Sequence, residues 1–305
     1  MRYSVIIPVY NRPDEVDELL QSLTQQSFKD FEVIVVEDGS SIPCKPVTEK
    51  YQELLDVHYY DKPNSGPGQT RNYGAERSKG EYLIILDSDC ILPEGYFLAV
   101  EEELQHEAAD AFGGPDRAHE SFTNIQKAIN YSMTSFFTTG GIRGGKKKMD
   151  KFYPRSFNMG VRQEVYQALG GFSRMRFGED IDFSIRIFKG GYTCRLFPGA
   201  WVYHKRRTDF RKFFKQVHNS GIARINLYKK YPESLKLVHL LPAAFTLGVA
   251  IFLLGTPFCP YSLLPIALYA LLVCMDSTIR NRSLSIGLYS VAALSLIHIS
   301  EPTRP

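Results

Sequence analysis

The sequence lacks the features that mark disulfide-stabilised, nucleic-acid-binding and dinucleotide-binding proteins. Its five cysteines are scattered and form no CxxC pair, which excludes a disulfide framework and fits a reducing compartment. The net charge of the 305 residues is only +3, so nothing in the composition suggests a nucleic-acid partner. No GxGxxG motif occurs, which argues against a dinucleotide-binding Rossmann domain. The first apolar run, 5–10, is too short for a secretory signal and leads into a turn.

The first part of the chain alternates strand and helix patterns. Short apolar and β-branched runs predict strands at 5–9, 31–36, 57–60, 82–86, 192–197 and 200–203. Helical patterns begin at Pro13 and cover 47–55, 69–77, 94–107, 161–169 and 181–188. Strands separated by helices form βαβ units, so we predict an α/β fold with a largely parallel sheet covered on both faces.

Two carboxylates one residue apart, Asp87 and Asp89, end the apolar run of the fourth strand. Open α/β sheets bind ligands at the carboxyl ends of their strands, and hard oxygen donors there suit a divalent cation that holds a diphosphate. A lone DSD sequence is more often a capped turn. Two further acidic motifs, EDGS at 37–40 and GED at 178–180, favour the functional interpretation.

The middle of the chain contains a glycine-rich, basic segment, GGIRGGKKK, at 140–148. This composition is typical of a mobile surface loop. The functional alternative is a lid that becomes ordered when substrate binds.

After Tyr231 the composition becomes strongly apolar, with runs at 235–254, 261–275 and 284–299. A membrane span needs about 20 residues, so the first run is long enough and the second is short. The basic block at 205–230 precedes these runs and predicts attachment to the cytoplasmic face of a membrane. A buried helical hairpin is the alternative. The last twelve residues resemble a translated adapter sequence, so we expect the native chain to differ there.

Four motifs in order resemble those of family 2 glycosyltransferases: VIIPVYN, VVEDGS, NSGPGQTRNYGAERSKGEYLIILDSD and FGEDIDFSIRIFKGGY. The resemblance covers roughly residues 3–231. It implies a GT-A fold, a nucleotide-diphosphate sugar donor and inversion at the anomeric carbon. We therefore predict a GT-A domain over 1–231, followed by a hydrophobic transmembrane region over 232–305.

The resemblance also implies which residues bind the donor. The nucleotide would lie across the segment after the first strand, and a carboxylate after the second strand would accept hydrogen bonds from the base. The carboxylate that ends the fourth strand would contact the ribose, or the metal through water. The predicted donor-binding residues are Pro8, Tyr10, Asn11, Asp38, Arg71 and Asp87. For Asp38 an ordinary Asp-Gly turn is the alternative, and for Arg71 a helix cap.

A divalent ion, Mn²⁺ or Mg²⁺, is implied by the same resemblance. Asp89 would ligate it directly, and His204 is either a further ligand or a structural histidine. The ion would stabilise the charge of the departing nucleotide diphosphate as a Lewis acid. A histidine ligand points towards Mn²⁺.

Asp180 is the predicted general base. Inverting transfer needs a carboxylate opposite the leaving group, to remove the proton of the acceptor hydroxyl. The helix that starts beside Asp180 favours its charged form. Glu179 and Asp182 are the rivals, with Glu179 in a supporting role and Asp182 turned away from Asp180 on the helix.

The acceptor is predicted from the region that follows the catalytic motifs. The QxxRW motif of processive synthases is absent, which suggests transfer of one sugar. Phe210, Phe213, Phe214 and Val217 alternate with basic residues, as in a helix at a membrane surface near a lipid-linked acceptor. Family analogy places this chemistry in envelope glycan assembly, with a UDP- or GDP-sugar donor, at the cytoplasmic side of the inner membrane. The alternatives are a sugar-1-phosphate nucleotidyltransferase and a non-catalytic nucleotide-sugar-binding subunit.

Overall fold

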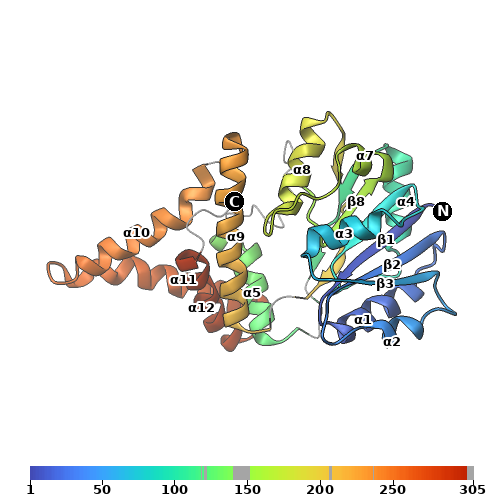
Figure 1. The fold of residues 1–305 in the computed structure, drawn as a ribbon. Coiled ribbons are helices and arrows are strands. Elements are labelled where there is room, and N and C mark those ends of the chain that lie inside the picture. The colour runs from blue at the N-terminus through green and yellow to red at the C-terminus, as the bar shows by residue number, and fades with distance from the viewer. Residues whose placement is uncertain (118, 120–121, 140–151, 206–207, 236, 301–305) are drawn as a thin grey trace. The chain divides into compact units, whose positions relative to one another are not determined.

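The computed structural model describes residues 1–117, 119, 122–139, 152–205, 208–235 and 237–300 (Figure 1). Two compact units divide the chain: the first is 1–117 with 148–204, and the second is 118–147 with 205–305. The glycine-rich segment at 140–148, for which we predicted a mobile loop or lid, lies outside the described residues. The predicted catalytic domain, 1–231, takes in the whole first unit and part of the second. Its functional boundary stays a prediction.

The first unit is built on a seven-stranded sheet with the order β3-β2-β1-β4-β8-β6-β9. Its strands are β1 (Tyr3–Val9), β2 (Phe31–Asp38), β3 (Val57–Lys62), β4 (Tyr82–Leu86), β6 (Ala111–Gly113), β8 (Asn158–Arg162) and β9 (Cys194–Leu196). All neighbouring pairs are parallel except those of β8, which runs antiparallel to β4 and β6. The predicted α/β class with a mostly parallel sheet is confirmed.

A second, three-stranded sheet begins directly after Asp89 of the DSD sequence. It consists of β5 (Cys90–Ile91), β10 (Val202–His204) and β7 (Asp116–Arg117), in the order β5-β10-β7. In the antiparallel pair of β10 and β5, His204 lies opposite Cys90. This register brings His204 next to Asp89, although more than a hundred residues separate them in the sequence.

Helices cover both faces of the large sheet (Figure 1). On one face lie α1 (Pro13–Thr24) and α4 (Tyr96–His106), and α2 (Lys45–Glu49) packs beside α1. On the other lie α3 (Pro67–Ala75), α7 (Gln163–Ala168) and α8 (Glu179–Lys189). A side chain at Gly74 would meet the Ile6 methyl group at 2.7 Å, so glycine lets α3 approach β1 closely. That approach fixes the position of Arg71, one turn earlier in α3.

Several predicted helices have different bounds in the structure, among them the two at 161–169 and 47–55. The helix predicted at 161–169 begins at Gln163, because Val161 and Arg162 pair with β4 and complete β8. The sheet offers both residues hydrogen-bonded partners that a local pattern does not show. The helix predicted at 47–55 ends at Glu49, and turns replace its second half.

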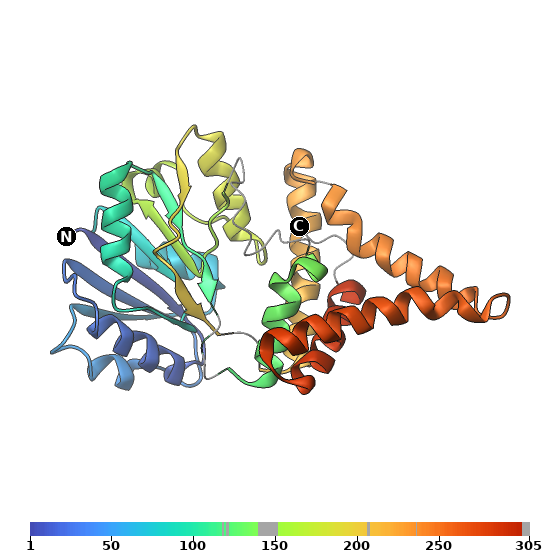
Figure 2. The ribbon, with the colours of Figure 1, turned by 180° about the vertical axis from the view of Figure 1, so that it is seen from behind.

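The second unit is helical. Its α-helices are α5 (Asn124–Thr134), α6 (Phe136–Thr139), α9 (Phe210–Lys230), α10 (Leu241–Leu254), α11 (Leu264–Asn281) and α12 (Leu284–Ser300), the last four coloured orange to red in Figure 2. The 3₁₀ turns are η1 (Pro232–Ser234), η2 (Leu237–Leu240) and η3 (Pro260–Leu263). Phe213 and Val217 of α9 pack against α5 and α12. The amphipathic helix predicted at the basic block therefore exists; Phe210, Phe213 and Val217 of its predicted stripe are in this core, whereas Phe214 is exposed.

The apolar runs have different lengths from those expected. Within the described residues, the segment Tyr261–Asn281 is long and apolar enough to cross a membrane, and only 11% of its most apolar window is buried. The first run, expected to be long enough, forms the 14-residue helix α10, because Leu237–Leu240 is a separate 3₁₀ turn before Pro242. Attachment to a membrane stays a prediction.

Candidate active site at the carboxyl edge of the sheet

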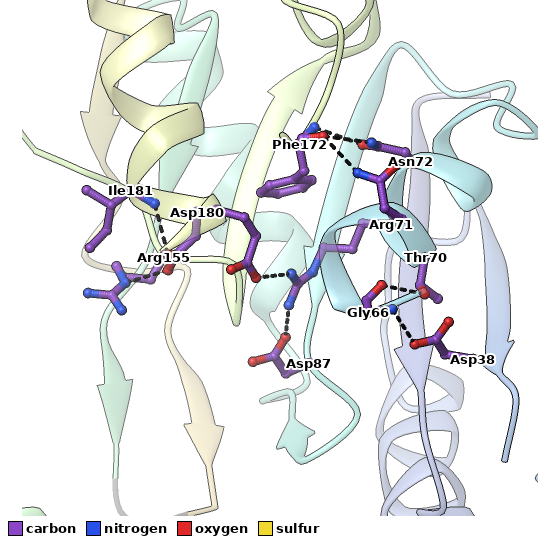
Figure 3. Close-up of polar contacts among 12 residues, drawn as sticks. Asp38, Gly66, Thr70, Arg71, Asn72, Asp87, Arg155, Phe172, Asp180 and Ile181 are labelled. Atoms are coloured by element: carbon purple, nitrogen blue, oxygen red, sulfur yellow. Dashed lines mark hydrogen bonds and ion pairs between the residues drawn. The ribbon is translucent and has the colours of Figure 1, made fainter. Parts of the chain in front are cut away.

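The acidic motifs lie at the same edge of the large sheet. The parallel register pairs Val9 with Glu37 and Asp38 with Lys62, so β1, β2 and β3 end together. Asp87 directly follows β4, the other neighbour of β1. Figure 3 shows that Asp38, Asp87 and Asp180 come from three separate segments that meet around α3.

Arg71 joins two of the four sequence motifs, its own, which ends in DSD, and the one that contains GED. Its guanidinium donates one hydrogen bond to Asp87 Oδ1 at 2.7 Å and another to Glu179 Oε1 at 3.0 Å (Figure 3). The side chain is buried, and its charge lies 5.3 Å from the centre of the Phe172 ring. We predicted that Arg71 faces phosphate or base. The structure shows it instead holding two carboxylates in place, and a contact with the donor stays a prediction.

Asp180 is held at the start of α8 by two donors. Arg155 Nε donates to Asp180 Oδ2 at 2.7 Å, and the backbone N–H of Ile181 donates to Oδ1 at 2.9 Å. Gly178 precedes the helix with φ of 84°, a left-handed conformation that favours glycine. Burial by itself would raise the pKa of Asp180, but the charges of Arg155 and Arg71 and these hydrogen bonds hold it below its ordinary value. Asp180 is therefore a charged carboxylate at neutral pH.

Glu179 differs from its neighbour Asp180. Burial and the adjacent charge of Asp180 raise the pKa of Glu179 above its ordinary value, against the opposing effect of Arg71. The other rival, Asp182, is fully buried and accepts a hydrogen bond from Arg186 Nε at 3.0 Å. Arg186 also binds the carbonyl oxygens of Leu169 and Gly171, so this pair anchors a turn. Of the three acids, Asp180 is the best placed to act as a base.

Asp38 organises the loop before α3. Its carboxylate accepts hydrogen bonds from the backbone N–H groups of Ser65 and Gly66, both at 2.9 Å, and forms an ion pair with Lys62. Burial would raise the pKa of Asp38, but Lys62 and the Ser65 N–H lower it overall. The structure thus shows a loop-capping role. The predicted hydrogen bond to a nucleotide base stays a prediction.

The residues after β1 and β2 shape the loops at this edge. Pro8 is the penultimate residue of β1, and Tyr10 is exposed. Asn11 has a positive φ of 54°, and its side-chain oxygen accepts hydrogen bonds from the N–H groups of Ser41 and Ile42. Glu37 is buried and accepts a hydrogen bond from the Cys44 N–H at 2.7 Å. Asn11 and Glu37 both hold the β2–α2 loop in place.

Asp89 and His204 form a candidate metal pair. Asp89 Oδ1 lies 3.1 Å from His204 Nε2, and Arg12 contacts the other oxygen at 2.9 Å. A carboxylate oxygen and an imidazole nitrogen so close together suit a first-row ion such as Mn²⁺. Cys90 lies beside them, but burial raises the pKa of its thiol well above the ordinary value. The Cys90 thiol donates a hydrogen bond to the Phe157 carbonyl oxygen at 3.3 Å, so Asp89 and His204 are the residues that fit best.

A pocket of about 340 Å³ opens beside Asp38. Its lining residues are Glu37, Gly39, Ser40, Pro43, Lys45, Tyr59, Asp61 and Lys62. They belong to β2, β3, the β2–α2 loop and the first residue of α2. The pocket therefore lies on the Asp38 side of the edge, and its lining includes neither Asp89 nor Asp180.

Three cations of this edge were not predicted: Arg12, Lys62 and Arg155. Each contacts a predicted acid: Arg12 binds Asp89, Lys62 binds Asp38, and Arg155 binds Asp180. Arg12 directly follows the VIIPVYN motif, which could have drawn attention to it. Arg155 and Lys62 belong to no quoted motif, and only the folded chain shows their partners.

The mostly parallel α/β sheet with acidic turns at its carboxyl edge is consistent with the GT-A class of fold. The chain belongs to the family described as "Glycosyl transferase family 2", whose model matches residues 4–170. This is the family that the four ordered motifs predicted.

Two curated relatives illustrate the similarity. An uncharacterised glycosyltransferase of Haemophilus influenzae is 30% identical over 193 residues, which are 61% of this chain and 62% of the relative. Glycosyltransferase AglE of Haloferax volcanii is 26% identical over 80% of both chains. The matches to the first three curated relatives span 62%, 23% and 13% of those proteins.

Two solved structures share the fold. Mannosyltransferase PcManGT of Pyrobaculum calidifontis, in complex with GDP-Man and Mn²⁺, has a TM-score of 0.70 at 16% identity, over 98% of this chain and 86% of that one. The 1–349 fragment of S. aureus TarS, in complex with UDP-GlcNAc, has a TM-score of 0.53 at 20% identity, over 75% of this chain and 67% of that one. At these identities the similarity establishes the fold.

Proposed function

We propose that this chain transfers one sugar from a UDP- or GDP-linked donor to a hydroxyl acceptor, with inversion at the anomeric carbon. The observation that carries the proposal is the link through Arg71. This buried cation, which belongs to the third motif, binds Asp87 at the end of the same motif and Glu179 of the fourth motif. The base candidate Asp180 is thereby held beside the acidic turn where a donor diphosphate would lie.

The donor would lie along the carboxyl edge. The pocket beside Asp38 is the proposed place for the nucleotide base, and its lining residue Ser40 accepts a hydrogen bond from the Asn11 N–H at 2.7 Å. Pro8 and Tyr10 stay predicted donor contacts. Asp89 and His204 would hold a divalent ion, Mn²⁺ or Mg²⁺. When bound, such an ion neutralises the charge on a departing nucleotide diphosphate. The solved relatives with GDP-Man and Mn²⁺ or with UDP-GlcNAc support this class of donor.

Asp180 is the proposed base. The acceptor oxygen attacks the anomeric carbon, the bond to the diphosphate oxygen breaks, and the acceptor proton passes to Asp180 Oδ2. Arg155 occupies that oxygen in the structure and must turn aside first. Its side chain is 41% exposed, so it has room to move towards solvent. The lowered pKa of Asp180 keeps the carboxylate ready to accept the proton.

The acceptor is proposed to be a lipid-linked or envelope glycan at the cytoplasmic face of the inner membrane. The apolar segment Tyr261–Asn281 is mostly exposed. Large apolar side chains are also exposed elsewhere in the second unit, among them Leu247, Ile251, Leu254, Phe258, Leu284 and Leu288. Exposed apolar surface of this kind marks a membrane or protein contact. The basic residues of α9 would favour anionic lipid.

A panel of nucleotide sugars tests the proposal. Thermal unfolding with Mn²⁺ should show a raised melting temperature for the true donor, because a ligand of the folded state stabilises it by mass action. With that donor and a hydroxyl acceptor, Asp180→Asn should lower turnover about 10²–10⁴-fold. Glu164→Gln, an exposed acid on α7, is the matched control and should retain full activity.

Two outcomes would support the alternatives. Equal, metal-independent rates of donor hydrolysis by the natural chain and Asp180→Asn would indicate a non-catalytic nucleotide-sugar-binding subunit. Release of pyrophosphate from a nucleoside triphosphate and a sugar phosphate would indicate a nucleotidyltransferase, which the family assignment disfavours.

A further inference from the structure

A second group of chemically active side chains lies at the opposite, amino edge of the large sheet. Glu32 is the second residue of β2, His58 is the second residue of β3, and Asp56 directly precedes β3. Their ligand atoms all lie within 4.8 Å of one another. None of the sequence motifs includes these residues, and the proposed transfer reaction does not use them.

The buried carboxylate of Glu32 points into this group. Its Oε1 accepts hydrogen bonds from Ser4 Oγ at 2.6 Å and from the Lys79 backbone N–H at 2.7 Å, so the side chain is held in one position. The side chain is only 1% exposed. Among the described residues nothing donates a hydrogen bond to Oε2, which lies 3.7 Å from His58 Nε2. A buried carboxylate oxygen without a hydrogen-bond donor destabilises the fold unless a cation binds it.

The distances suit a shared metal ion. His58 Nε2 lies 3.1 Å from Asp56 Oδ1 and 3.7 Å from Glu32 Oε2. Zinc bonds of about 2.0–2.1 Å at tetrahedral angles put neighbouring ligand atoms about 3.3 Å apart, between these two values. In the described structure His58 Nε2 forms no hydrogen bond with either carboxylate, despite its closeness to both. The three ligand atoms are thus close enough to coordinate one ion, and no hydrogen bond of His58 Nε2 to the residues described competes with that role.

We propose that Glu32, Asp56 and His58 bind a divalent first-row metal ion of the zinc type, with water in the fourth position. Two carboxylate oxygens and one imidazole nitrogen form a donor set that such ions accept. The side chains of His58 and Asp56 are 37% and 50% exposed, so an ion can enter from solvent and Asp56 can turn towards it.

The ion would join the starts of β2 and β3. Because β3 is the edge strand, its pairing in the large sheet is with β2 alone. The other end of β3 carries Lys62, the ionic partner of Asp38. The proposed site is therefore structural: it secures the edge strand at the end opposite the candidate active site.

The test measures Zn²⁺ binding in the full-length chain after treatment with a chelator. All proteins carry Asp89→Asn, so that the candidate catalytic metal pair does not contribute. The parent protein should retain one zinc per chain after gel filtration and should show a higher melting temperature with Zn²⁺. The added change His58→Gln should abolish both effects. His106→Gln removes an exposed histidine of α4 and is the matched control, which should retain both.

Glu32→Gln and Asp56→Asn extend the test and should each reduce the retained zinc. Asp56 is half exposed, so its variant should fold even if the buried Glu32 variant does not. If the parent retains no zinc and its melting temperature does not respond, the proposal is wrong. The same holds if His58→Gln binds zinc as the parent does. A histidine that forms only an ion pair would give the first of these results, with stability that depends on pH alone.

Discussion

The two ends of one sheet carry carboxylates with different partners. At the carboxyl edge Asp38, Asp87, Asp89, Glu179 and Asp180 each contact lysine or arginine. At the amino edge the ionic partner of Glu32 and Asp56, within the described residues, is the histidine His58. Lysine and arginine keep their charge at all physiological pH values, whereas histidine can lose its proton and bind a metal.

The two edges therefore differ in how the protein stabilises its carboxylates. Permanent cations hold the acids of the candidate active site charged and oriented before any donor arrives. They also occupy the oxygens that the reaction needs, so substrate binding has to displace some of them. A histidine leaves its neighbours available to an ion from solution.

The largest expected effect comes from removing Arg71. Arg71→Met leaves Asp87 and Glu179 without their common partner in a buried setting. Breaking a buried pair in this way typically costs about 3–5 kcal/mol in the free energy of unfolding. Denaturant unfolding measures this loss. The variant should also bind donor weakly, because the acidic turn and α8 are no longer linked.

Arg162 provides a matched control for Arg71. It also contacts two carboxylates, Asp110 and Glu164, but it lies at the surface and is 30% exposed. Arg162→Met should cost at most about 1 kcal/mol, since exposed ion pairs contribute little. Similar losses for the two variants would contradict the view that the carboxyl edge depends on a buried cation.

A smaller effect concerns the pH dependence set by Arg155. The lowered pKa of Asp180 contributes stability that is present above the unfolded value of 3.8 and is lost as pH falls through the folded value. Arg155→Gln removes the lowering charge, so burial should raise the pKa of Asp180. The acid limb of the kcat/KM–pH profile, which reports the free enzyme with Arg155 in place, and the loss of stability in acid should then both move to higher pH.

Arg155→Lys is the control for this change, because it retains the positive charge. Its acid limb should stay close to that of the natural chain. An acid limb that does not move in Arg155→Gln would show that another group controls the rate, and Asp180 would lose its place as the base.

The smallest effect is expected at the amino edge. In protein freed of metal, His58→Gln should change the free energy of unfolding by at most about 1 kcal/mol, because the histidine and Asp56 are both partly exposed to solvent. Chemical unfolding in the presence of a chelator measures this change. A loss as large as that of Arg71→Met would show that the two edges do not differ as described.

Much of the sheet could be predicted from local patterns. The strand 82–86 has the predicted bounds, and the helix predicted from Pro13 buries Val16, Leu19, Leu20 and Leu23, which are spaced at i, i+3, i+4 and i+7. An apolar run with a clear strand or helix periodicity specifies that element, whatever it packs against in the fold. Val161 and Arg162 are an exception: they belong to strand β8, because pairing with β4 outweighed their helical pattern.

The candidate site was predicted by its acids and missed by its cations. Aspartates in turns after apolar strands are visible in a sequence, because the strand end and the acid are adjacent. Arg155 and Asp180 are 25 residues apart, and Lys62 and Asp38 are 24 apart. Arg71 was predicted as a donor contact, but its burial between Asp87 and Glu179 depends on how closely α3 packs on β1.

The sequence by itself determined the family, the alternation of strands and helices, and the acidic turns, because each of these is written in short contiguous motifs. Only the tertiary structure decided which cation holds which acid, and that Glu32, Asp56 and His58 meet at the far edge. The physical reason is range: periodicity and turn chemistry act over a few residues. Charge pairing and metal coordination depend on distances of about 3 Å between side chains, and strand register and helix packing set those distances.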